Sequence, residues 1–105
     1  MKLFSFFKRK LKKDPTAVQR IRRVTEYMPE FYKTHRQFLA CIEYLDYNEW
    51  GLALDSLIQL ADETGHYFSE EFWLELAAAA DTMKLDKEAG YCREQIKRSQ
   101  KDIGS

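Results

Sequence analysis

The sequence predicts an all-α protein, a single compact bundle of about five helices arranged as helical hairpins. Its 105 residues suffice for one domain with one core. Only four glycines and two prolines occur, which is too few for the many tight turns of an all-β fold. Apolar residues recur at helical spacings of three and four, and seven Phe, six Tyr and two Trp supply the core.

The first helix is predicted over residues 15–27. Asp14 is placed to cap it, and Pro15 suits the first helical position, where the missing backbone N–H is not needed. One face of the segment is apolar and should point inward. It holds Val18, Ile21, Val24, Thr25 and Met28.

Pro29 ends the first helix and can open the second, which is predicted over residues 30–46. His35 fills one step of the apolar stripe of this helix, so we interpret it as a packed core histidine rather than a catalytic base. The other members of the stripe are Phe31, Phe38, Ile42 and Leu45.

Three more helices follow, and each has a residue that can cap its N-terminus: Asn48, Ser69 and Asp86. Gly65 suits the left-handed residue just after the end of the third helix. The fourth should end near residue 83 and the fifth near residue 101. The side chains predicted to face the core are Trp50, Leu54, Leu57, Ile58, Ala61, Trp73, Leu76, Ala77, Ala80, Ala89, Cys92 and Ile96.

A weak internal repeat supports the hairpin arrangement. An offset of 35 residues aligns apolar positions of the second and third helices with those of the fourth and fifth; Phe38 falls on Trp73, and Leu57 falls on Cys92. The glycine, tyrosine and proline of tetratricopeptide repeats are missing, and two units are fewer than such arrays need. We therefore interpret the repeat as two hairpins of similar size.

Charges are segregated along the chain although they sum to zero. Residues 1–23 carry nine Lys or Arg and one acid, whereas residues 43–81 carry ten Asp or Glu and no Lys or Arg. A surface of one sign attracts a partner of the opposite sign. Two interpretations stay open: the acidic segment meets a cationic partner, or the basic N-terminus neutralises it within the fold.

Residues 1–13 form a basic amphipathic arm, ahead of a helical bundle domain over 14–101 and a frayed tail over 102–105. The arm alternates Phe and Leu with Lys and Arg, as in segments that lie on anionic membrane surfaces. Its phenylalanines could equally pack on the domain while its cations pair with the acidic middle. Binding of nucleic acid is the weakest alternative, because the rest of the domain would repel phosphates. Cations interrupt the apolar start too early for a secretory signal, so we expect the arm to be retained.

No motif for catalysis, cofactor binding or metal binding occurs, so the sequence predicts no enzyme, no cofactor and no metal site. Cys41 and Cys92 lie far apart and are predicted to be free thiols, which fits the cytoplasm. His66 follows a glycine that ends a helix, and we interpret it as a solvated loop residue. No apolar run approaches the roughly 18 residues that span a bilayer.

The segments 48–57, 62–65, 68–72 and 79–86 together resemble a small helical family of bacterial toxin immunity proteins. This family includes the immunity proteins of contact-dependent growth inhibition systems and the Maf-type immunity proteins. The shared pattern is a helix that opens with an acid, an aromatic and Gly-Leu-Ala-Leu, a helix opened by Ser-Glu-Glu and an aromatic, and an exit that ends in Met-x-Leu-Asp. The resemblance covers residues 42–96.

The resemblance implies a protein that binds the toxic C-terminal domain of a cognate polymorphic toxin in the cytoplasm and neutralises it without catalysis. Many such toxins are nucleases, and an acidic helical surface can fill the cationic cleft of a nuclease. Tyr47 and Leu52 are the expected apolar anchors. The full set of predicted partner-binding residues is Asp46, Tyr47, Glu49, Leu52, Asp55, Asp62, Glu63, Glu71 and Glu75. The alternative is a helical adaptor or interaction module held peripherally at the inner membrane by residues 1–13.

Overall fold

The computed structural model of the chain describes residues 16–65 and 68–104, with side chains as far as Arg98. Within these residues it consists of α-helices and one short 3-10 helix, which confirms the predicted all-α bundle. The elements are α2 (Ala17–Tyr27), η1 (Glu30–Tyr32), α3 (Arg36–Asp46), α4 (Trp50–Thr64), α5 (Glu70–Thr82) and α6 (Asp86–Gly104).

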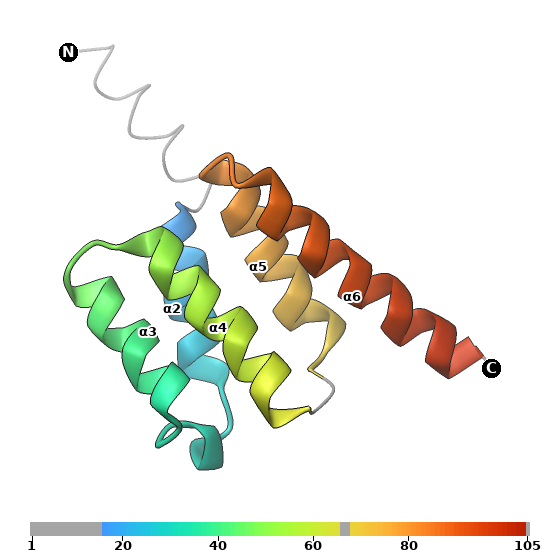
Figure 1. The fold of residues 1–105 in the computed structure, drawn as a ribbon, viewed down its shortest axis with the longest axis horizontal. Helices are drawn as coiled ribbons and strands as arrows, with labels where there is room; N and C mark the ends of the chain where they lie inside the picture. Colours follow the sequence, from blue (N-terminus) through green and yellow to red (C-terminus); the bar gives the residue numbers. More distant parts are fainter. Residues whose placement is uncertain (1–15, 66–67, 105) are drawn as a thin grey trace, which may run out of the picture.

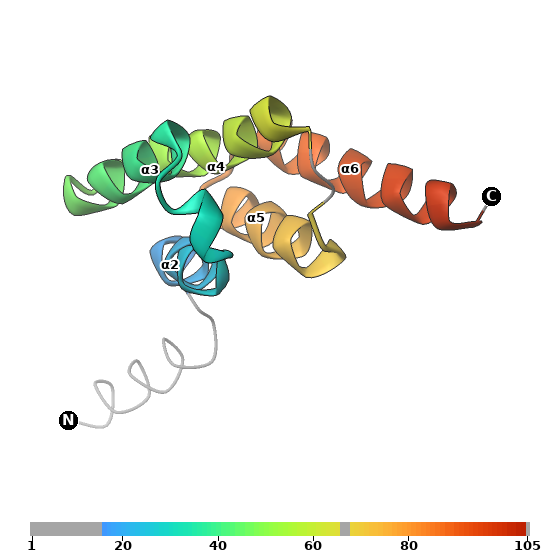
Figure 2. The same cartoon turned by 90° about the horizontal axis from the view of Figure 1, so that it is seen from below.

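The helices pack in two layers. Helices α3, α4 and α6 lie on one side of the molecule, and α2 and α5 lie on the other (Figure 2). The most extensive helix contacts join α3 to α4 and α5 to α6, so each of these pairs is a hairpin, and α2 packs on α5. The last turns of α6 run past the start of α5 (Figure 1). The predicted arrangement as helical hairpins is therefore confirmed.

The two hairpins turn in the same way. Asn48, after α3, and Lys84, after α5, both adopt the left-handed conformation with φ of 60°. In each turn the next N–H donates back to the carbonyl oxygen five residues earlier, Glu49 to Tyr44 and Leu85 to Ala80, both at 2.8 Å. This bond closes the last turn of each helix in a Schellman motif. The two turns lie 36 residues apart, whereas the buried helix faces follow the predicted offset of 35.

The core is built from side chains of all five described α-helices. The largest fully buried side chains are Ile21, Leu45, Leu54, Leu57, Leu60, Leu76, Cys41 and Cys92. Both cysteines are free thiols, and burial raises the pKa of each to about 12. A thiol with such a pKa is almost entirely protonated at neutral pH and is therefore a poor nucleophile.

The start of α2 differs from the prediction. Thr16 is the N-cap: its hydroxyl accepts the N–H of Gln19 at 3.2 Å, and the side-chain oxygen of Gln19 accepts the N–H of Thr16 at 2.8 Å. This reciprocal pair is a capping box. Asp14, the predicted cap, lies outside the described residues.

The segment between α2 and α3 also differs. Residues 29–35 form η1 and a turn instead of the first part of a longer helix, so α3 begins only at Arg36. His35 is consequently the N-cap of α3, and its Nδ1 accepts the N–H of Gln37 at 3.0 Å. The interpretation of His35 as a packed core histidine is wrong. Phe31, predicted to be buried, is 71% exposed because η1 takes it off the register of α3.

Of the predictions for the ends of α4 and α5, those for Gly65 and Ser69 are confirmed and that for Asn48 is wrong. Gly65 adopts the left-handed conformation after α4, and the hydroxyl of Ser69 caps α5 by accepting the N–H of Phe72 at 3.2 Å, both as predicted. Asn48 does not cap α4, because it closes α3; the N-cap of α4 is Glu49. Trp50, at the first position of α4, is exposed rather than buried.

The last helix is longer than predicted, whereas the predicted N-terminal arm is not described by the structure. Helix α6 continues to Gly104, beyond its predicted end near residue 101. The predicted arm over residues 1–13 lies outside the described residues. None of the described helices is long and apolar enough to cross a membrane.

Candidate interaction surfaces

Four of the nine predicted contact residues gather where α3 ends and α4 begins. Asp46 is the last residue of α3, Tyr47 follows it, Glu49 precedes α4, and Leu52 lies in the first turn of α4. All four are exposed, Tyr47 by 72% and Leu52 by 45%. The two carboxylates make no hydrogen bond or ion pair with another described residue. We call these four residues the acidic end.

Asp46, the acid at the end of α3, does not stabilise this helix. The C-terminus of a helix carries a partial negative charge, so a carboxylate there is unfavourable by about 0.3–1 kcal/mol. Asp46 occupies this position, and none of the helices α2, α3, α4 and α5 has a basic residue in its last turn. The charge of the acidic end therefore opposes the dipole of α3.

The start of α4 lies next to the turn between α5 and α6. A Cβ atom at Gly51 would lie 3.7 Å from Cδ1 of Leu85. One turn further along α4, the Asp55 carboxyl lies beside the Glu88 carboxyl of α6, and the two can share a hydrogen bond when one of them is protonated. Asp55 is one of the predicted partner-binding residues, but it is half-buried at this contact. Burial, together with the neighbouring Glu88 carboxylate, raises the pKa of Asp55 above its ordinary value.

Replacing Asp55 with asparagine should stabilise the protein at pH 7. A carboxyl whose pKa is raised by folding binds its proton more tightly in the folded state, so its contribution to stability falls as the pH rises through the folded pKa. The asparagine side chain cannot ionise and keeps a hydrogen bond to Glu88. We expect a gain of about 0.5 kcal/mol at pH 7, the size of a solvent-screened charge contact, and no gain near pH 4. The change in the free energy of unfolding is measured at both pH values by urea denaturation, with circular dichroism as the readout.

The matched control is Glu94→Gln, because Glu94 is an exposed acid of α6 for which no interaction with another described residue is found. This variant should match the wild type at both pH values. If Asp55→Asn is less stable than the wild type at pH 7, the ionised Asp55 stabilises the fold, and our interpretation of the Asp55–Glu88 contact is wrong.

Three more of the predicted contact residues form hydrogen bonds with neighbouring helices: Asp62, Glu63 and Glu75. Asp62 accepts a hydrogen bond from the Tyr91 hydroxyl of α6, and desolvation followed by this bond raises the pKa of Tyr91 to about 12. Glu63 accepts from Arg36 at 3.1 Å and from the amide of Gln37 at 3.0 Å. The two bonds of Glu63 connect the end of α4 to the start of α3.

Glu75 is held by two arginines of α2. Its Oε1 accepts from Arg20 at 2.9 Å, and its Oε2 accepts from Arg23 at 3.4 Å. Part of the acidic segment is therefore neutralised by basic residues from the N-terminal stretch, which is the second interpretation left open by the sequence. The acidic end has no such partner among the described residues.

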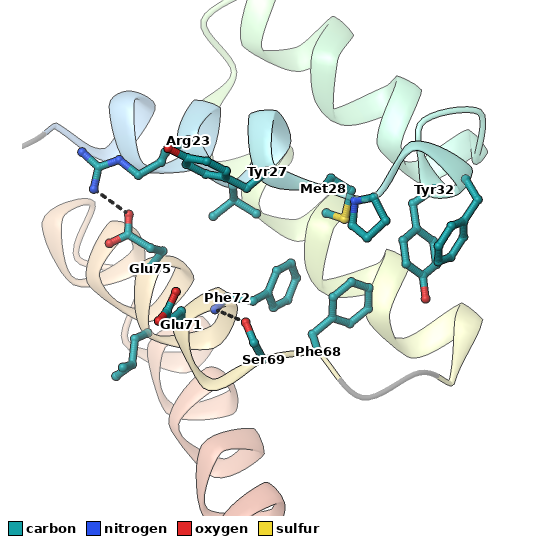
Figure 3. Close-up of a pocket in the computed structure, with 13 residues that line it drawn as sticks. Arg23, Tyr27, Met28, Tyr32, Phe68, Ser69, Glu71, Phe72 and Glu75 are labelled. Carbon is teal, nitrogen blue, oxygen red and sulfur yellow. Dashed lines mark hydrogen bonds and ion pairs between the residues drawn. The ribbon is translucent and has the colours of Figure 1, made fainter.

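Glu71, the ninth predicted contact residue, borders a groove at the opposite end of the bundle. The groove lies between the end of α2, η1 and the start of α5, and its volume is about 780 Å³ (Figure 3). Aromatic side chains dominate its lining, so we call it the aromatic groove. Its lining residues are Arg23, Val24, Tyr27, Met28, Pro29, Phe31, Tyr32, Phe68, Ser69, Glu71, Phe72, Leu74 and Glu75.

The aromatic groove was not predicted from the sequence. Tyr27 is 83% exposed at the end of α2, and Leu74 is 50% exposed on α5. A usable signal was present, because Tyr27 and Phe31 flank Pro29, and a proline between two helical segments removes nearby side chains from a common stripe. The structure thus separates the predicted contact residues into the acidic end, the residues that contact or bond to a neighbouring helix, and Glu71 at the groove.

The described residues offer no site for metal chemistry. Over residues 16–65 and 68–98, no group of three or more His, Cys, Asp or Glu side chains is arranged to hold a metal ion. Comparisons with protein-family models, curated proteins and solved structures found no match to this chain.

Proposed function

We propose that this chain is an immunity protein that acts in the cytoplasm, without catalysis. It binds and neutralises the C-terminal domain of a cognate polymorphic toxin through the acidic end. The toxin domain is a cationic protein, most simply a nuclease. The proposal joins the family resemblance of residues 42–96 to the physical properties of one surface.

The observation that carries the proposal is the pairing of unneutralised charge with exposed apolar area. Asp46 and Glu49 have no ion pair with the described cations, and they flank the exposed ring of Tyr47. Leu52 adds an exposed aliphatic side chain in the next turn. Interfaces obtain specificity and fast association from charge, and most of their affinity from a few packed aromatic or aliphatic anchors. The acidic end holds both kinds of group.

The position of Asp46 adds support. An acid at a helix C-terminus costs local stability, and a cationic partner bound there would offset that cost. A cleft that binds phosphates presents cations to solvent, so an acidic surface can dock in it and exclude the nucleic acid. Such docking needs no active site on the inhibitor.

The direct test uses the gene neighbourhood. The gene directly upstream should encode a large secreted protein, and a catalytically inactive form of its C-terminal domain should co-purify with the tagged full-length chain. The full-length chain should also abolish the activity of the wild-type domain. Because the contact is electrostatic in part, the affinity should fall as the ionic strength rises.

Lysozyme, a cationic protein of comparable size, serves as the control. It should neither co-purify with the chain nor weaken the toxin complex. The proposal is wrong if no toxin-like gene lies upstream, or if the chain binds lysozyme and the upstream domain equally well.

A further inference from the structure

The aromatic groove has a continuous aromatic lining. The ring centroids of Phe31 and Tyr32 lie 4.4 Å apart, those of Tyr32 and Phe68 5.3 Å apart, and those of Phe68 and Phe72 4.4 Å apart. Tyr32 and Phe72 are buried and form the inner part of this row, whereas Phe31 is exposed at its edge. Aromatic faces carry a negative partial charge that attracts cations within about 6 Å of the ring centre.

Large exposed apolar side chains border this row. Tyr27 comes from α2 and is mostly exposed at the groove, and Leu74 comes from α5 and is half exposed there. Apolar area that converges on a hollow from separate elements marks a binding site more often than scattered exposure does. The volume of about 780 Å³ lies within the range of about 300–1,000 Å³ that is typical of small-molecule sites.

Among the described residues, the charged side chains of the lining are Arg23, Glu71 and Glu75. Arg23 and Glu75 pair with each other, and Glu75 also accepts from Arg20. Glu71 is exposed and makes no ion pair with a described cation. In Figure 3 it stands on the same side of the groove as Ser69 and Glu75. Of the two described carboxylates in the lining, Glu71 is therefore the one that makes no ion pair with a described cation.

The polar groups of the groove suit binding rather than reaction. The Ser69 hydroxyl accepts the N–H of Phe72 as the cap of α5, and among the described residues no histidine or cysteine belongs to the lining. A carboxylate beside an aromatic surface complements a positive charge carried on an apolar body.

We propose that the aromatic groove binds a small organic cation, with its ammonium or guanidinium group at Glu71 and its apolar body on the rings of Phe31, Phe68 and Phe72. The site is separate from the acidic end and does not depend on the proposed function. It adds a ligand-binding activity to the chain.

The test is a titration of the isotope-labelled full-length chain that is monitored by nuclear magnetic resonance. The probes are choline and its neutral isostere 3,3-dimethylbutan-1-ol, which differ in charge but hardly in shape. Choline should shift the signals of groove residues to saturation in the millimolar range. It should bind about fivefold more tightly than the isostere, the factor expected for one solvent-accessible cation–π and charge contact.

Glu71→Gln should lower the choline affinity by about fivefold and leave that of the isostere unchanged. The matched control Glu94→Gln removes an exposed acid outside the groove lining and should leave both affinities unchanged. Both substitutions are at exposed positions, so the fold is expected to persist, and the spectra themselves report this.

Three results would overturn the proposal: no saturable shift in the groove, equal affinities for choline and the isostere, or shifts centred on Asp46 and Glu49. The last result would mean that choline binds wherever carboxylates are exposed. If Glu71→Gln binds choline as well as the wild type does, the proposed position of the cation is wrong.

Discussion

The double substitution Asp46→Lys with Glu49→Lys is expected to weaken toxin binding about a hundredfold at low ionic strength, which corresponds to about 3 kcal/mol. The change places like charges opposite the cationic partner on both sides of Tyr47. Its effect should shrink as salt is added, because salt screens exposed charges. Isothermal titration calorimetry with the inactive toxin domain at two ionic strengths measures both quantities.

The stability of the double variant should stay close to that of the wild type. Lysine at position 46 suits the C-terminus of α3, whereas lysine at position 49 opposes the dipole at the N-terminus of α4, and each effect amounts to about 0.3–1 kcal/mol. The matched control is Glu26→Lys with Glu94→Lys, which changes the net charge equally at exposed sites outside the acidic end. If both double variants lose the same affinity, only the net charge matters, and the acidic end is not the interface.

Leu76→Ala should destabilise the fold by about 3 kcal/mol. Leu76 is fully buried on α5, the helix that packs against α2, α4 and α6. Truncation leaves a cavity there that these three helices together cannot close. For a domain of this size the total stability is about 5–15 kcal/mol, so the variant should fold but unfold at about 2 M less urea.

Leu74→Ala provides the control for this prediction. Leu74 lies two positions earlier on the same helix and is half exposed, so the same chemical change should alter stability by less than about 0.5 kcal/mol. Comparable losses for the two variants would show that α5 does not form the centre of the core. Urea denaturation followed by circular dichroism distinguishes the outcomes.

Much of the fold could be predicted from local patterns. Apolar spacing identifies the inner faces of the helices, and the cap at Ser69 and the left-handed Gly65 are set by neighbouring residues. The segment around Pro29 could not be resolved in the same way. Proline can either end one helix or begin the next, and the apolar stripe from Phe31 to Leu45 fits an uninterrupted helix. The 3-10 helix that forms instead exposes Phe31.

The candidate surfaces were harder to predict, because helical periodicity gives a direction only relative to the axis of one helix. It indicates which face of α4 is polar, but not that α6 approaches this face. Asp55 is therefore half-buried beside Glu88, and Asp62, although exposed, accepts a hydrogen bond from Tyr91. The same reason accounts for the two arginines on Glu75, which lie more than 50 positions away in the sequence. The prediction of exposure holds at Tyr47 in the turn after α3 and at Leu52 and Glu71 near the starts of α4 and α5.

The burial of both cysteines has a practical consequence for following complex formation. Cys41 and Cys92 have fully covered side chains, so thiol reagents at neutral pH meet no accessible native thiolate. A single cysteine introduced in place of the exposed Glu94, which lies outside the acidic end and the groove lining, would thus be the preferred attachment point for a fluorophore. The native protein is in this respect ready for site-specific labelling, and its own thiols need not be removed first.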